Sequence, residues 1–118
     1  MRIVTYNIWD GGVNDSDGDR TERLLGILES LKPDLLLLTE ACGFGAPEDA
    51  PFQDWLRRLD MTGDRIEAPS GFHLALLARK PCSIRSIESI HKQIFYHGCL
   101  SATVDTPLGE VRLLGVHL

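Results

Sequence analysis

Glu40 is the residue of this sequence whose position most strongly indicates chemistry. It follows residues 34–39 (DLLLLT), whose length and continuous apolar character predict a strand buried on both faces. An ionised carboxylate at the end of such a strand is unfavourable unless it is paired, hydrated or bound to a metal ion. A glycine-containing loop follows, and α/β folds place their ligands at this end of their strands. We therefore expect a binding partner for Glu40.

A second polar residue, Asn7, is expected to reach the same place from another strand. Residues 2–8 (RIVTYNI) are rich in strand-forming residues. Residues 19–31 predict a helix, because a D-x-x-E capping box precedes leucines at helical spacing and a Lys-Pro pair follows. A right-handed βαβ crossover makes the two strands parallel neighbours. Asn7 and Glu40 would then lie at the same edge of one sheet.

The middle of the chain predicts a second helix. It begins near residue 49 with a proline in its first turn, and its aromatic and leucine residues form an apolar face suited to packing on a sheet. This face consists of Phe52, Trp55, Leu56 and Leu59. Gly63 and residues 69–71 (PSG) are interpreted as turns.

The second half predicts a series of strands that we expect to be antiparallel. Strand patterns cover residues 72–78, 84–90, 100–104 and 111–118. The last two are joined by residues 105–110 (DTPLGE), which are suited to a hairpin turn. A βαβ start followed by antiparallel strands gives an α+β fold class.

The acidic segment at residues 14–19 (NDSDGD) does not match a calcium-binding loop. The EF-hand pattern needs a glycine at the sixth position after an acid and a closing glutamate at the twelfth, and neither frame fits. A solvated loop that leads into the first helix is the favoured interpretation.

Composition narrows the function classes. The 118 residues suffice for one domain, residues 1–118, and no apolar run reaches the roughly 18 residues of a membrane span. No signal peptide is visible, and three cysteines without a C-x-x-C pair favour a reducing compartment, so we expect a cytoplasmic protein. The net charge of −5 and the lack of a basic patch disfavour duplex nucleic acid as a partner.

Four segments in this order resemble the endonuclease/exonuclease/phosphatase family of DNase I-like proteins. They are residues 5–9 (TYNIW), 35–41 (LLLLTEA), 71–81 (GFHLALLARKP) and 114–118 (LGVHL). Departures from the family pattern are Thr39 in place of a frequent glutamine, Ala78 in place of serine, and Gly115-Val116 before His117. The resemblance implies the N-terminal half of a four-layer α/β/β/α sandwich, because the family's later Asp-x-Asn and Asp-His pairs have no counterpart here.

The resemblance also implies roles for individual residues. Glu40 would bind Mg²⁺, with Mn²⁺ as an alternative ion. Asn7 would help order the metal shell and would also serve catalysis by a hydrogen bond to the phosphate or to a catalytic Asp. His117, also catalytic, would contact the scissile phosphate. Each has a simpler interpretation: a surface acid for Glu40, a turn cap for Asn7, and a packed or fraying terminal residue for His117. Trp9 is interpreted either as flanking the site or as packing in the core.

Several other residues are interpreted as structural. His73, His91 and His97 lack metal-ligand spacing and are read as structural or surface residues. Arg79, directly after its strand, is read as structural or ion-pairing.

Two functions of different classes follow. The first is a Mg²⁺-dependent phosphoesterase acting on phosphodiesters or phosphomonoesters, with small-molecule or lipid-headgroup esters favoured over nucleic acid, and with little activity expected of this chain alone. The second is a non-catalytic half-domain that forms a homodimer through an open C-terminal strand surface, since the sequence stops at Leu118 within an apolar strand. That ending is typical of a truncated polypeptide or of a surface covered by a partner. A doubly wound nucleotide-binding domain is disfavoured, because no glycine-rich phosphate loop follows the first strand.

Overall fold

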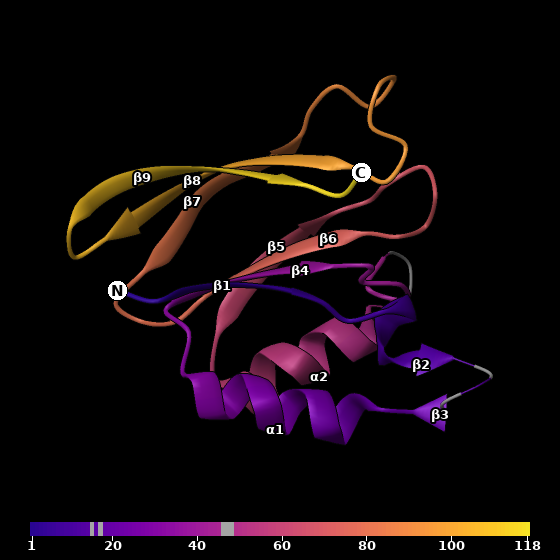
Figure 1. Ribbon diagram of the computed structural model, residues 1–118. Coiled ribbons are helices and arrows are strands. Elements are labelled where there is room, and N and C mark those ends of the chain that lie inside the picture. The colour runs from indigo at the N-terminus through magenta and orange to yellow at the C-terminus, as the bar shows by residue number, and fades with distance from the viewer. Residues whose placement is uncertain (15, 17, 46–48) are drawn as a thin grey trace.

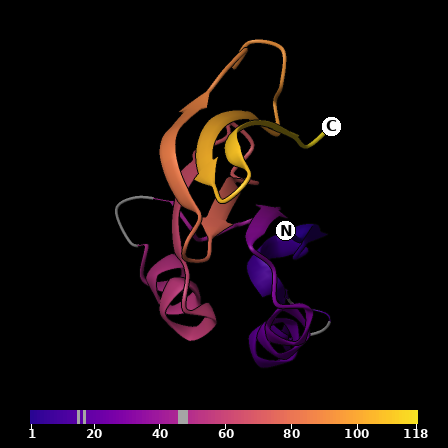
Figure 2. The ribbon, with the colours of Figure 1, turned by 90° about the vertical axis from the view of Figure 1, so that its left-hand side faces the viewer.

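Three layers of secondary structure build the molecule (Figure 1). The computed structural model describes residues 1–14, 16, 18–45 and 49–118. Helices α1 (Thr21–Leu31) and α2 (Ala50–Leu59) cover one face of a four-stranded sheet, and a three-stranded sheet packs on its other face. Viewed after a 90° turn, the two helices lie side by side beneath the sheets (Figure 2). The predicted α+β fold class is confirmed.

The four-stranded sheet contains the predicted parallel pair. Its order is β1-β4-β6-β5, with β1 (Ile3–Asn7) parallel to β4 (Leu35–Thr39). β6 (Leu74–Ala78) runs antiparallel to both β4 and β5 (Thr62–Ile66). The βαβ unit therefore forms as expected, and antiparallel strands extend it.

The second sheet is entirely antiparallel, as the sequence predicts. Its order is β7-β8-β9, formed by β7 (Ser83–Ser89), β8 (Cys99–Thr106) and β9 (Gly109–Val116). Between β1 and α1 lie a short 3₁₀ turn, η1 (Asp10–Gly12), and the small hairpin of β2 (Val13–Asn14) and β3 (Gly18–Asp19). Residues 15 and 17 of the acidic segment lie outside the described residues.

The leucine run of β4 explains how the layers are held together. Successive side chains of a strand point to opposite faces of the sheet. Leu36 and Leu38 accordingly belong to the core between the helices and the four-stranded sheet, which also contains Trp55 of α2. Leu35 belongs to the core between the two sheets, with Leu100 of β8. All five side chains are at most 2% exposed. β4 is apolar throughout because both of its faces are buried.

Two details of the helices and turns differ from the sequence-based predictions. Glu22 does not close a capping box: both of its carboxylate oxygens accept hydrogen bonds from Arg58 of α2, at 2.8 Å. Asp19 still accepts from the backbone N–H of Thr21, at 2.8 Å. Gly63 is not a turn but lies within β5, a strand that the prediction missed.

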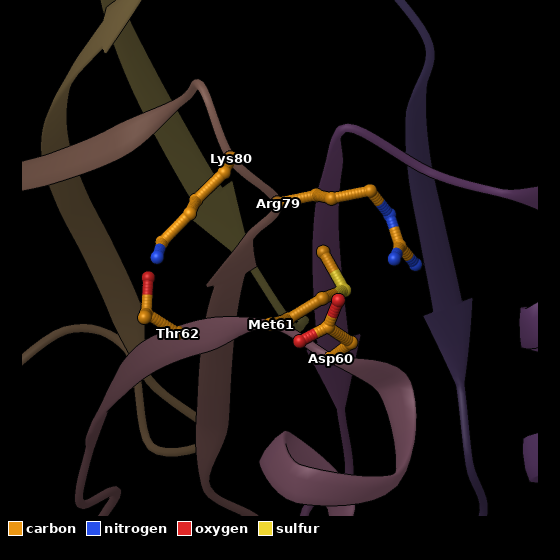
Figure 3. Close-up of a pocket in the computed structure, with 5 residues that line it drawn as sticks. All are labelled: Asp60, Met61, Thr62, Arg79 and Lys80. Carbon is orange, nitrogen blue, oxygen red and sulfur yellow. The ribbon is translucent and has the colours of Figure 1, made fainter.

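The end of the sheet away from Glu40 is occupied by structural contacts. A hollow of about 340 Å³ lies there, lined by Asp60, Met61, Thr62, Arg79 and Lys80 (Figure 3). The Arg79 guanidinium donates to the carbonyl of Pro33 at 3.1 Å, and its backbone N–H donates to that of Asp34 at 2.8 Å. Arg79 thus ties the start of β4 to the end of β6, which supports the structural interpretation.

Neither of the described helices combines the length and the apolar character that crossing a lipid bilayer requires.

Gly63 is expected to be intolerant of substitution because of close packing. A Cβ at this position would lie 2.8 Å from the Leu76 carbonyl oxygen and 2.9 Å from Leu56 Cδ2. Gly63→Ala should lower the free energy of unfolding by about 1–3 kcal/mol, measured by urea denaturation. Gly26→Ala is the matched control: it lies exposed in α1 with nothing within 4 Å, and should raise stability by about 0.5–1 kcal/mol. Equal effects would contradict the packing explanation.

Candidate functional site

The carboxylate of Glu40 lies at the carboxyl end of β4 and is held by two N–H donors. Oε1 accepts a hydrogen bond from Nδ2 of Asn7 at 2.9 Å, and Oε2 accepts one from the backbone N–H of Asp10 at 3.1 Å. Glu40 has a φ of 54°, so the chain turns sharply where the strand ends. Its side chain remains 20% exposed, which leaves the carboxylate open to a ligand.

The register of the parallel strands brings Asn7 to this carboxylate. Asn7 pairs with Thr39, so Glu40 is the next residue along the neighbouring strand. The predicted meeting of Asn7 and Glu40 at one sheet edge is confirmed. The amide oxygen of Asn7 accepts the backbone N–H of Trp9 at 2.8 Å, so the turn-capping interpretation also holds. One amide therefore stabilises the loop with its oxygen and orients Glu40 with its nitrogen.

His117 reaches the same place from the other sheet. It follows β9, and its Nε2 lies 3.6 Å from Oε1 of Glu40, with 19% of its side chain exposed. In Figure 1 the C-terminal end of β9 lies on the same side of the molecule as the loops after β1 and β4. Its backbone N–H donates to the carbonyl of Gly98 at 3.4 Å, so residue 117 is anchored rather than frayed. The three residues singled out from the sequence thus converge.

The surroundings of His117 favour one tautomer. Its Nδ1 is buried and has no hydrogen-bond partner among the described residues. A proton there would be a buried, unpaired donor, so the neutral ring carries its proton on Nε2. The ring of His97 lies 5.0 Å away and that of Phe72 6.3 Å away, between centroids. These tilted and edge-on ring contacts hold Nε2 toward Glu40.

The remaining histidines have structural contacts. Nδ1 of His73 accepts the N–H of Ala68 at 3.0 Å, and burial lowers the pKa of His73, so the ring is neutral near pH 7. His91 is exposed and makes a tilted ring contact with Phe95, with 6.5 Å between ring centroids. No group of three or more His, Cys, Asp or Glu residues that would hold a metal ion occurs within the described part of the chain. These observations favour the structural reading of His73 and His91.

Comparison with known proteins was made on sequence and on structure. No protein-family model and no curated protein matches the sequence. A solved structure from Beutenbergia cavernae, described as an endonuclease/exonuclease/phosphatase, matches with a TM-score of 0.68 and 20% identity over 100% of this chain and 38% of its own.

Two further proteins match in structure. D. rerio TDP2, humanized by 14 mutations, has a TM-score of 0.75 and 22% identity over 98% of this chain and 49% of its own. D. rerio TDP2 in complex with a single-strand DNA product also matches, with a TM-score of 0.71. ANGEL2, described as a 2′,3′-cyclic phosphatase in complex with adenosine-2′,3′-vanadate, has a TM-score of 0.74 and 14% identity over 98% of this chain and 40% of its own.

The chain has the endonuclease/exonuclease/phosphatase fold. It spans between 38% and 49% of the length of these matched structures. The fold expected from the ordered segments is therefore confirmed: the helices and two facing sheets are three of the four layers that the resemblance implies.

Electrostatics at this end of the endonuclease/exonuclease/phosphatase fold favour a cation. Burial, together with a hydrogen bond to Asp10 and the charges of Asp10 and Glu40, raises the pKa of Cys42 to about 12. The thiol is thus protonated at neutral pH and unsuited to act as a thiolate nucleophile. The same negative potential would stabilise a bound cation.

A magnesium ion fits the donors present, although sparsely. Mg²⁺ prefers oxygen ligands and is commonly held by one or two carboxylates, with water and phosphate oxygens completing the shell. Each oxygen of Glu40 accepts one hydrogen bond and keeps a further lone pair. The site provides one hard, oriented, accessible carboxylate, which is the minimum for such an ion.

The structure decides the positions of two residues that follow β1. Asp10 holds Glu40 through its backbone N–H, a role that no side-chain pattern reveals. Trp9 was left between a flanking and a core position, and at 58% exposure it is not part of the core. The signal for both was the Asp-Gly-Gly turn directly after β1, which requires the chain to fold back on the strand end.

The raised pKa of Cys42 predicts slow alkylation. Near pH 9, the ordinary pKa of a thiol, and in metal-free buffer, iodoacetamide should modify Cys42 far more slowly in the native chain than in urea. Asp10→Asn removes a nearby negative charge, lowers the pKa and should speed the reaction several-fold, as measured by peptide mass spectrometry. The buried Cys82 and Cys99 are internal controls whose rates should not respond. Unchanged Cys42 kinetics in the variant would contradict the electrostatic cause.

Proposed function

We propose that this chain forms part of a Mg²⁺-dependent phosphoesterase site in which Glu40 binds the ion. The observation that carries the proposal is the convergence of Asn7, Glu40 and His117, from three strands in two sheets, within 3.6 Å of one carboxylate oxygen. An amide, a carboxylate and an imidazole at the carboxyl ends of strands are suited to binding and hydrolysing a phosphate ester. The endonuclease/exonuclease/phosphatase fold supports the same class of reaction.

Asn7 would act through Glu40 rather than as a direct ligand. Its Nδ2 faces Oε1 of Glu40 and its Oδ1 is engaged by Trp9, so both ends of the amide already have partners. Hydrogen bonds from outer residues fix the orientation of a ligating carboxylate and raise metal affinity. Asn7 is thus proposed as a positioning residue for Glu40.

His117 would contact the phosphate. The proton on Nε2 points into the site, where it can donate to a non-bridging oxygen of the ester. A bound Mg²⁺ would supply positive charge to the same oxygens. The imidazole and the ion would then share the stabilisation of negative charge that builds up during hydrolysis.

The substrate class is proposed as a phosphodiester or phosphomonoester. Among the matched structures, a D. rerio TDP2 holds a single-strand DNA product and ANGEL2 holds adenosine-2′,3′-vanadate. The preference for small-molecule or lipid-headgroup esters gains no support from those structures. The net charge of −5 continues to disfavour tight binding of duplex nucleic acid.

An open apolar groove favours a second candidate, a dimerising half-domain. The groove has a volume of about 430 Å³ and lies between edge strands β1 and β9, where Ile3 is 50% and Leu114 66% exposed. Exposed apolar edges invite strand pairing. Size-exclusion chromatography over a range of concentrations separates the candidates, because a monomer at every concentration would argue against dimerisation.

Metal binding is the direct test of the phosphoesterase proposal. The chain is expected to bind Mn²⁺, a spectroscopic substitute for Mg²⁺, weakly, because Glu40 is the one carboxylate proposed as a ligand here. Glu40→Gln should abolish binding measured by electron paramagnetic resonance, and Asn7→Ala should weaken it about tenfold. Glu88→Gln, the same change at an exposed position of β7, should leave it unchanged.

Hydrolysis provides the second readout. With a generic phosphodiester and Mg²⁺, this chain alone should show little turnover, since the described residues contain no group of three or more His, Cys, Asp or Glu side chains that could hold a metal ion. Rapid metal-dependent turnover by the chain would contradict this expectation. Retention of Mn²⁺ binding in Glu40→Gln would refute the assignment of the ligand.

A further inference from the structure

Trp9 carries an exposed aromatic side chain, and its backbone follows the residue that orients the Glu40 carboxylate. It is 58% exposed, whereas the other tryptophan, Trp55, is 2% exposed in the core. Its neighbour Asp10 donates its backbone N–H to Glu40, and Asn7, two residues earlier, donates its amide. Since consecutive Cα atoms are about 3.8 Å apart, the backbone of Trp9 lies within one residue of groups that contact the carboxylate.

The backbone of Trp9 is held in a conformation that side-chain-bearing residues rarely adopt. Its φ is 48°, and that of Asp10 is 58°. Both values lie in the left-handed region, which is disfavoured for bulky residues and persists only where the surroundings impose it. Three hydrogen bonds impose it here: the N–H of Trp9 to Asn7 at 2.8 Å, and two to its carbonyl, from Gly12 at 3.1 Å and from Arg20. The tryptophan is therefore presented to solvent by a fixed loop.

Arg20 fixes the indole ring as well as the backbone. Its guanidinium carbon lies 5.3 Å from the ring centroid, in a cation–π arrangement over one face. Because Trp9 is 58% exposed, much of its surface remains accessible beside this contact. An aromatic ring that is held in place by a cation and still accessible to solvent is suited to stack on a planar ligand.

We propose that Trp9 is a stacking platform for the planar group of the phosphate ester, a nucleobase in particular, while the phosphate lies at Glu40. The proposal rests on the function proposed for Glu40 and adds the class of substrate. Every nucleobase has a π-face, so stacking selects nucleotides over sugar phosphates without selecting one base. Trp9 acts as a specificity-determining residue and not as a participant in the chemistry.

The test compares two ligands that carry the same phosphate. AMP and ribose 5-phosphate are titrated with Mg²⁺ and followed by isothermal titration calorimetry, and AMP should bind about tenfold more tightly because only AMP can stack. AMP should also quench the fluorescence of Trp9, and the buried Trp55 provides an unresponsive background. Ribose 5-phosphate should not quench.

Substitutions locate the effect. Trp9→Ala should reduce the affinity for AMP to that for ribose 5-phosphate and leave the affinity for ribose 5-phosphate unchanged. Trp9→Phe keeps an aromatic ring and controls for a folding defect, so it should retain part of the preference for AMP. Leu108→Ala, which removes a 78% exposed apolar side chain in the β8–β9 turn, should alter neither affinity. Circular dichroism checks that each variant is folded.

The outcomes separate this proposal from the one on which it rests. Equal affinities for the two ligands, both lost in Glu40→Gln, would overturn the platform and leave the metal–phosphate site standing. Tighter binding of AMP that persists in Trp9→Ala would also overturn the platform. Binding of neither ligand would overturn both proposals.

Discussion

The parallel pairing of β1 with β4 is the constraint on which the site depends. Asn7 pairs with Thr39, and this register alone places the amide beside the carboxylate of Glu40. Because side chains alternate between the faces of a sheet, a slip of one residue in this pairing would move Asn7 to the other face, away from the Glu40 carboxylate. The apolar packing of β4 on both sides therefore stabilises the geometry of a polar site at its end.

The second sheet contributes His117 through packing rather than through hydrogen bonding between the sheets. β9 approaches β4 closely at Gly115, where a Cβ would lie 2.9 Å from the Leu37 side chain. This contact gives a physical reason for Gly115, two residues before His117, where the sequence departs from the family pattern. A larger residue at 115 would push β9 away and carry the imidazole of His117 from its position 3.6 Å from Glu40. The spacing between the sheets thus sets the width of the site.

The sequence predicted what depends on local pattern and failed where contacts between distant segments decide. The helices, the βαβ unit and the shared edge of Asn7 and Glu40 follow from periodicity and from the handedness of crossovers. β5 was missed because Gly63, which resembles a turn residue, is required by the approach of Leu76. The capping box failed because Glu22 pairs with Arg58 on the other helix. The proximity of His117 to Glu40 depends on how two sheets pack, which no local pattern records.

The negative charge around Glu40 gives a reason why the proposed site would need a bound cation before a phosphate ester could bind. The chain carries a net charge of −5, and the carboxylates of Glu40 and Asp10 are close enough to help raise the pKa of Cys42 to about 12. A phosphate ester that approaches this potential unaided is repelled. A divalent ion at Glu40, as proposed, would reverse the sign of the local field and would let an acidic chain bind an anionic substrate. Burial is the main reason that the Cys42 thiol keeps its proton, and the nearby carboxylates add to it. The proposed ion would neutralise part of that same negative charge.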